Sequence, residues 1–284
     1  MDTSTAVNRQ PGALWRFLQF PLTRLVLAMA SIAAVIVLFQ VGGAALPRPV
    51  ALLLSAVAVT GVYIVNVRAI ERRDVVEFRL DGAGREVVLG LLVGAGLFSA
   101  TMAILYICGA WTLAGVNPVG ALGYPLVGAL AAGVSEEIIF RGVFFRIVEE
   151  SLGSWLALLL SAALFGLAHA PNPGATTVST LAIALEAGIT LAAGYMYTRR
   201  LWLVIGLHTA WNFTEGGIFG TSVSGTDAHG LLTLQFHGPD LLTGGAFGPE
   251  ASLVAVVVCV MAGGILLTHS QRTNRIVAPF WRRA

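Results

Sequence analysis

Long apolar stretches recur along this chain, and most are long enough to cross a lipid bilayer. A membrane-spanning helix needs about 20 mainly apolar residues. Stretches of this kind occur at eight places, residues 22–41, 50–67, 87–109, 124–146, 154–170, 178–198, 201–215 and 251–269. Charged residues make up only 11% of the sequence, whereas a soluble domain carries roughly 25%. The sequence therefore predicts an all-α fold, a polytopic transmembrane bundle of about eight helices.

The positions of the arginines predict how these spans are oriented. The chain has no lysine, and its 17 basic residues are all arginine. With eight spans and both termini in the cytoplasm, every arginine except Arg48 lies on the cytoplasmic side, as the positive-inside rule requires. The first span follows Arg9, Arg16 and Arg24 and is predicted to be a retained anchor, not a cleaved signal peptide. We therefore expect a multi-pass protein of the cell membrane, and the net charge of +2 gives no indication of nucleic-acid binding.

Polar groups inside the membrane are concentrated in the second half of the chain, which suggests four regions. Residues 1–110 are expected to form a scaffold of spans one to three, and residues 111–216 a polar core of spans four to seven. Residues 217–250 form an extracytoplasmic loop, and residues 251–284 hold the last span and a basic cytoplasmic tail. The loop is rich in Gly, Ser and Thr and is expected to be solvated, since its histidines and aspartates match no known metal-site spacing.

Span four contains the sequence V-S-E-E-I-I-F-R-G, with three charged residues in an apolar helix. Glu137 and Arg141 are four residues apart on one helix face and are expected to form an ion pair. Glu136 is left without a local partner. It lies roughly 15 Å along the helix from Arg146, at a depth where an ionisable side chain costs about 2.5–3.5 kcal/mol. Glu136 is therefore the candidate general base.

Two further spans supply the other polar groups that hydrolysis of a peptide bond would need. His169 ends span five one turn after Phe165, and His208 and Asn212 share a face of span seven. Glu136 and His169 suit activation of a water, and His208 and Asn212 suit stabilisation of an oxyanion. Two plainer interpretations remain open: an interfacial His169, and interhelical hydrogen bonds from His208 and Asn212.

Three motifs follow one another on successive spans: E-E-x-x-x-R-G at Glu136 to Gly142, F-x-x-x-H at Phe165 to His169, and H-x-x-x-N at His208 to Asn212. This order resembles the CPBP family, which comprises CAAX-processing type II proteases, bacteriocin-processing enzymes and Abi proteins. The resemblance covers about residues 120–215 and identifies the polar core as a catalytic core. It implies an intramembrane endopeptidase that cuts a membrane-associated protein or peptide. The implied catalytic residues are Glu136, His169, His208 and Asn212, supported by Glu137, Arg141 and Phe165.

The sequence leaves the cofactor and the class of function open. Members of this family are commonly labelled metalloproteases, and Glu136, His169 and His208 could ligate Zn²⁺. A glutamate-activated water without metal is the alternative. A proton-coupled transporter could use Glu136, Glu186 and the histidines as a relay, and a catalytically silent scaffold or immunity factor is the third class. Neither the substrate nor the oligomeric state can be inferred from the sequence.

Overall fold

Apolar helices form almost all of the structure, a computed structural model that describes residues 12–283. The longer helices are α2 (Pro21–Val41), α3 (Arg48–Val65), α4 (Ala83–Ile107), α5 (Gly123–Glu137), α6 (Arg146–His169), α7 (Thr177–Ile183), α8 (Ile189–Thr198), α9 (Trp202–Asn212) and α11 (Leu253–Arg272). Two short helices, α1 (Ala13–Leu18) and α10 (Asp240–Thr243), lie outside these. The predicted all-α polytopic bundle is confirmed.

Four π-helical segments extend or join these helices. They are Asn66–Ile70 after α3, Ile138–Phe145 between α5 and α6, Ala184–Gly188 between α7 and α8, and Phe213–Ile218 after α9. A π-turn widens the helix locally and is frequent at functional sites. Three of the four segments carry a buried charged residue, Arg141, Glu186 and Glu215. The irregular turns therefore mark the part of the bundle where polar side chains converge.

Within residues 12–283, six helical segments are long and apolar enough to cross a membrane. The longest, Val119–His169, reverses direction at Gly153, which adopts a φ of 78°. A Cβ at this position would lie 2.7 Å from the backbone nitrogen of Pro279, so only glycine fits the turn. This segment therefore holds two of the predicted spans. The segment formed by α9 and its π-turn is too short to be included in these six. The total of eight membrane spans therefore stays a prediction.

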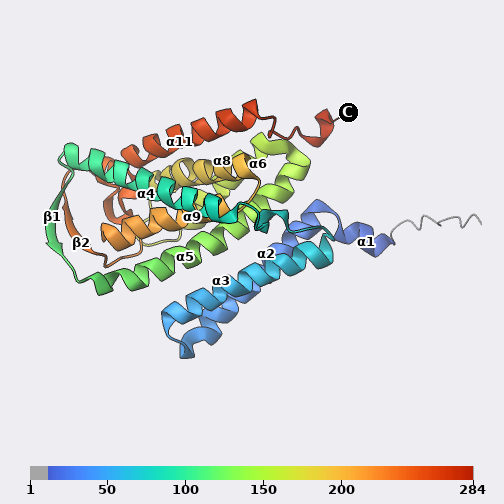
Figure 1. The fold of residues 1–284 in the computed structure, drawn as a ribbon, viewed down its shortest axis with the longest axis horizontal. Helices are drawn as coiled ribbons and strands as arrows, with labels where there is room; N and C mark the ends of the chain where they lie inside the picture. The colour runs from blue at the N-terminus through green and yellow to red at the C-terminus, as the bar shows by residue number, and fades with distance from the viewer. Residues whose placement is uncertain (1–11, 284) are drawn as a thin grey trace, which may run out of the picture.

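Helix α9 lies inside the bundle, and α2 and α3 form a hairpin at one side (Figure 1). Close contact between α4 and α9 fixes the position of α9. A Cβ at Gly90 would lie 2.2 Å from the carbonyl oxygen of Leu203, and one at Gly94 would lie 2.1 Å from that of Leu207. Small residues at such a crossing let two membrane helices touch through their backbones. This contact sets the depth and rotation of His208, the next residue on α9.

The loop of residues 217–250 folds back over the bundle. Its strand β2 (Leu232–Phe236) pairs in antiparallel fashion with β1 (Trp111–Val116), in a register that runs from Trp111↔Phe236 to Val116↔Leu232. Thr221, Phe247 and Glu250 are buried. The expectation of a solvated loop is wrong for this part, because the strand pairing and the buried side chains hold it against the helices.

Ion pairs gather at the opposite end of the bundle, near α1 and the C-terminal segment (Figure 1). Arg146 Nη2 lies 2.6 Å from Glu71 Oε1, and Arg24 Nη1 lies 2.7 Å from Glu150 Oε2. Arg199 pairs with Glu149 at the same end. Arg9, one of the arginines used to predict orientation, precedes the described residues. The multi-pass architecture thus has one end that is tied together by arginine–glutamate pairs.

Candidate active site

The predicted ion pair of Glu137 and Arg141 lies fully buried in the bundle. Arg141 Nη1 donates a hydrogen bond to Glu137 Oε1 at 2.9 Å, and both side chains are 0% exposed. Arg141 Nη2 also donates to the carbonyl oxygens of Ala187 and Gly188, at 3.2 and 3.1 Å. Additional hydrogen bonds of this kind offset part of the desolvation cost of a buried ion pair, although Glu137 Oε2 and Arg141 Nε are buried without a hydrogen-bond partner among the described residues. The pair therefore ties α5 to the π-turn before α8 and holds Glu137 in place.

His208 is oriented by this pair. Its Nδ1 lies 2.9 Å from Glu137 Oε1. A carboxylate that is paired with arginine accepts hydrogen bonds, so we assign the proton of the neutral ring to Nδ1. The other ring nitrogen, Nε2, is then an acceptor and lies 3.9 Å from Glu136 Oε2.

His169 is oriented in the same way by a backbone group. Its Nδ1 lies 2.8 Å from the carbonyl oxygen of Phe165, one turn earlier on α6, and donates to it. The ring centroids of Phe165 and His169 are 4.7 Å apart. The Nε2 atom of His169 therefore faces away from its own helix and lies 3.8 Å from Glu136 Oε2. Two imidazole nitrogens from α6 and α9 thus face one carboxylate oxygen from α5.

Glu136 is 28% exposed at the side of a cavity of about 640 Å³, here called the main cavity. His169, His208 and Asn212 line the same cavity. Separations of 3.8 and 3.9 Å are too long for direct hydrogen bonds, so Oε2 of Glu136 is buried between the two rings without a hydrogen-bond partner within residues 12–283. The structure therefore brings together all four residues that the sequence singled out, with Glu137, Arg141 and Phe165 directly behind them.

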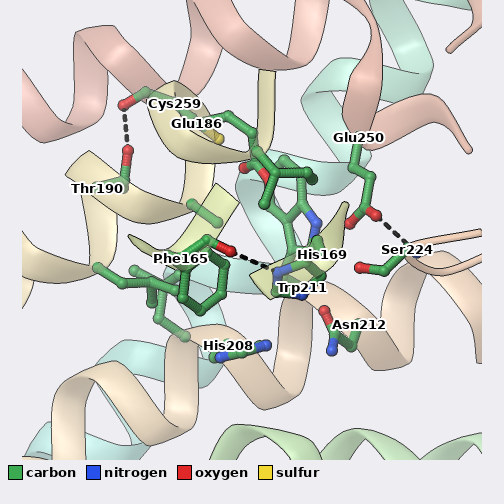
Figure 2. A pocket seen from close by; sticks show the side chains of 14 residues that line it. Phe165, His169, Glu186, Thr190, His208, Trp211, Asn212, Ser224, Glu250 and Cys259 are labelled. Atoms are coloured by element: carbon green, nitrogen blue, oxygen red, sulfur yellow. Dashed lines mark hydrogen bonds between the residues drawn. The ribbon is translucent and has the colours of Figure 1, made fainter. Parts of the chain in front are cut away.

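A second space, the inner chamber, is also lined by His169 and His208 (Figure 2). It has a volume of about 20 Å³, enough for a single water. Glu186, which belongs to none of the sequence motifs, lines it together with His169, Trp211 and Cys259. Glu250 of the loop lines it as well, and burial raises the pKa of this carboxyl above its ordinary value. Its Oε1 accepts a hydrogen bond from the backbone nitrogen of Ser224 at 2.6 Å.

Sequence reasoning missed Trp211, Ser224 and Glu250. Trp211 directly precedes Asn212 on α9. Its position on a helix inside the bundle is the signal that could have identified it. Ser224 and Glu250 carry no local signal, because the folding of residues 217–250 brings them to the site.

The three proposed metal ligands do not fit a zinc ion in this arrangement. Zinc lies about 2.0–2.2 Å from nitrogen and oxygen ligands, so tetrahedral ligand atoms are roughly 3.4 Å apart. Glu136 Oε2 is 3.8 Å from His169 Nε2 and 3.9 Å from His208 Nε2. Across residues 12–283, no group of three or more His, Cys, Asp or Glu side chains has a metal-binding arrangement.

Comparison with known proteins gives a family match over the part of the chain that holds the candidate site, and one curated relative. Residues 118–214 match the family described as type II CAAX prenyl endopeptidase Rce1-like. A protein of Bacillus subtilis (strain 168) named "Putative membrane peptidase YdiL" is 31% identical over 87 residues, which are 31% of this chain and 33% of that protein. The chain thus spans about a third of the length of the curated relative that it matches. No solved structure matches the chain.

The matched residues 118–214 include all three motifs and the helices from α5 to α9. Glu250 and the rest of the loop lie outside the match. The chain is a multi-pass membrane protein, and its segment 118–214 is similar to the Rce1-like type II CAAX prenyl endopeptidases, in the region where its motifs predict that resemblance.

Proposed function

We propose that this protein is an intramembrane endopeptidase that cuts a membrane-associated protein or peptide with a water activated by Glu136 and His169. The observation that carries the proposal is the approach of two imidazole Nε2 atoms, at 3.8 and 3.9 Å, to Oε2 of Glu136. This is a buried carboxylate oxygen without a hydrogen-bond partner in the described part of the chain, on a side chain that lines the main cavity. The family match and the named membrane peptidase support the same class of reaction.

The reaction follows from the hydrogen-bonding capacity of each group. A water between Glu136 and His169 donates one hydrogen to the carboxylate and the other to the imidazole Nε2, which exposes its lone pair to a substrate carbonyl. On attack, Glu136 takes a proton from the water and a tetrahedral oxyanion forms. When the C–N bond breaks, Glu136 returns that proton to the leaving nitrogen. The products are one new carboxyl group and one new amine.

Asn212 and His208 are proposed to stabilise the oxyanion. The side-chain amide of Asn212 is a donor in every protonation state, and it lines the main cavity beside Glu136. His208 donates from Nε2 only when its ring carries both protons, because Nδ1 already donates to Glu137. Donors fixed before the reaction are effective because little reorganisation is needed as charge develops.

The orientation in the membrane and the division of the chain into regions, both predicted from the sequence, are also proposals. We infer a location in the cell membrane with both termini in the cytoplasm and residues 217–250 outside, supported by the positions of the arginines. We also propose the division into a scaffold of residues 1–110, a catalytic core of residues 111–216, a loop of residues 217–250 and a final span with its tail.

Replacing the proposed base tests the function directly. The purified full chain is assayed with two internally quenched peptides that share one sequence ending in a CAAX-type tetrapeptide, one farnesylated and one not. We expect Glu136→Gln to abolish cleavage while leaving the unfolding temperature unchanged. Glu150→Gln, a carboxylate that is 40% exposed at the arginine-rich end, is the matched control.

Retained cleavage by the Glu136→Gln variant would show that the assignment of the base is wrong. Comparative proteomics of new N-termini in membranes that contain wild-type or Glu136→Gln protein extends the test to natural substrates. If neither peptide nor any membrane protein is cut in a Glu136-dependent manner, the protein is not a protease.

A further inference from the structure

We propose that the main cavity receives its substrate from the extracytoplasmic side of the membrane. The substrate class is then an extended segment of an exported or membrane-anchored polypeptide, not a cytoplasmic C-terminus. This inference rests on the proposed function for the nature of the substrate. The direction of access rests on the cavity itself and on the predicted orientation.

The main cavity follows one side of α5 from its beginning to Glu136. Gly128, Ala132 and Glu136 succeed each other at helical spacing and all line it. Gly120 and Tyr124 line its other end, next to Thr226 and Asp227 of the loop. Thr226, Asp227 and nearby His229 are exposed, so the mouth of the cavity is polar. The cavity therefore leads from Glu136 toward the end of the bundle that carries the strands β1 and β2.

The chain beyond Glu136, toward the arginine-rich end, is tightly packed. Glu137, Ile138, Arg141, Val143 and Phe145 are all buried completely or almost so. Leu201, which directly precedes α9, lies next to Gly142 of this stretch and is buried. Ala157 and Leu158 of α6 belong to the same buried cluster as Ile138, Val143 and Phe145. A peptide arriving from the arginine-rich end would have to displace this part of the core.

Distances along α5 place Glu136 near the middle of the bilayer. At 1.5 Å per residue, Glu136 lies about 18 Å from Tyr124 along α5, and the π-helical segment Ile138–Phe145 separates it from Arg146 on the other side. Tyrosine and arginine are both typical of the membrane interface, and the hydrocarbon core is about 30 Å thick. The mouth of the cavity therefore lies at the interface opposite to Arg146. About five or six residues of extended chain would reach from there to Glu136.

The lining also indicates what kind of segment fits. Gly128 and Ala132 present almost no side chain on the side of the cavity, and a Cβ at Gly128 would meet no atom within 4 Å. The small residues along this path leave room beside α5 for a substrate segment that is extended over several residues.

Labelling of single cysteines tests the direction of access without requiring activity. The two natural cysteines, Cys108 and Cys259, are first replaced by alanine. Gly128→Cys then places a thiol in the cavity, Leu113→Cys one on exposed β1, and Gly84→Cys one at the arginine-rich end, where a Cβ meets no atom within 4 Å. The probe is a small, positively charged methanethiosulfonate that does not cross membranes. It is applied to intact cells and to inside-out vesicles.

We expect Gly128→Cys and Leu113→Cys to react in intact cells, and Gly84→Cys to react only in inside-out vesicles. Reaction of Gly128→Cys only in inside-out vesicles would overturn the inference, and so would no reaction from either side. If Leu113→Cys reacts only from the cytoplasmic side, the orientation is reversed and the inference fails with it.

A parallel assay separates this inference from the proposed function. If Gly128→Cys is labelled from outside but no peptide is cut in a Glu136-dependent manner, the protease proposal fails and the direction of access stands. If the purified protein cuts peptides but Gly128→Cys is labelled only from the cytoplasmic side, the protease proposal stands and this inference fails.

Discussion

At the scale of single residues, the candidate site depends on a buried acid–base pair that orients the groups around it. Glu137 binds Arg141 and His208 through the same oxygen, at 2.9 Å in each case. Breaking a buried pair by removing one partner typically costs about 3–5 kcal/mol. The two adjacent glutamates thus have different tasks. Glu137 is buried and hydrogen-bonded to His208, whereas the side chain of Glu136 is partly exposed to the main cavity, where we propose that it activates a water.

The role of Asn212 can be tested by truncation. If its amide donates to the oxyanion, Asn212→Ala should lower kcat by roughly 10²–10³ with little change in KM, because the lost interaction exists only in the transition state. The measurement is steady-state cleavage of the quenched peptide, with unfolding temperature as the control for folding. An unchanged kcat would assign Asn212 to helix packing instead.

The sequence predicts the centre of the site better than its surroundings. Glu136, His169, His208 and Asn212 could be found because each lies on an apolar helix, where a polar side chain is costly and therefore conspicuous. The pairing of Glu137 with Arg141 follows from their spacing on one helix. The two carbonyl groups that also bind Arg141 could not be predicted, because a π-turn at Ala184–Gly188 brings them within reach.

At the scale of elements, the crossing of α4 and α9 positions the second histidine. Gly94→Ala would force a methyl group against the carbonyl oxygen of Leu207, 2.1 Å away, and backbone cannot yield as a side chain can. Overpacking of this kind costs about 1–3 kcal/mol. We expect a lower unfolding temperature and reduced cleavage, because His208 moves with Leu207.

Gly96→Ala is the matched control on the same helix, since a Cβ there meets no atom within 4 Å. This change should be neutral or stabilise α4 by up to about 1 kcal/mol, the difference in helix propensity between glycine and alanine. Equal unfolding temperatures for the two variants would contradict the close contact of α4 with α9.

Glu71 joins the end of α3 to the beginning of α6 and makes this junction sensitive to acid. Burial alone would raise the pKa of Glu71, but the charge and hydrogen bonds of Arg146, with Arg73 and Arg24, outweigh it and lower the pKa below its ordinary value of 4.5. A carboxyl with a lowered pKa stabilises the fold above its ordinary pKa and loses that contribution as the pH falls through its folded pKa.

We therefore expect Glu71→Gln to destabilise the protein at pH 7 by about 1.5–3 kcal/mol, the range for hydrogen bonds to charged groups. The difference from wild type should shrink as the pH falls below 4.5. Thermal unfolding in detergent at several pH values measures it, and Glu150→Gln at the same end should show a smaller effect. A difference that is constant across pH would mean that Glu71 acts through packing alone.

Helix positions could be predicted to within a few residues, because apolar length is a local property. The strand pair could not be predicted, because Trp111 pairs with Phe236 across more than a hundred residues and neither segment has a distinctive pattern of its own. The loop was expected to be solvated because its composition is polar. Its path in the structure is set by contacts with distant helices, which a local composition does not reveal.

At the scale of the whole molecule, the two ends of the bundle differ. One end is closed by arginine–glutamate pairs, and the other carries the folded loop and the mouth of the main cavity. Arg48, the one arginine that the sequence assigns to the outside, begins α3 next to the turn of the α2–α3 hairpin, away from those pairs (Figure 1). This difference between the two ends agrees with the predicted orientation, in which most arginines are cytoplasmic. The main cavity then opens at the end opposite to most of the positive charge.

The spacing of the site also bears on whether the molecule works with a metal. Hydrogen bonds from Nδ1 to Glu137 and to the carbonyl oxygen of Phe165 hold the two rings, and both Nε2 atoms stay about half an ångström farther from Glu136 than a shared zinc ion requires. We therefore expect cleavage of the quenched peptide to persist after exhaustive chelation, in protein whose metal content is far below one ion per chain. Loss of cleavage on chelation, followed by recovery with stoichiometric Zn²⁺, would instead mean that the three side chains close around a metal during the reaction.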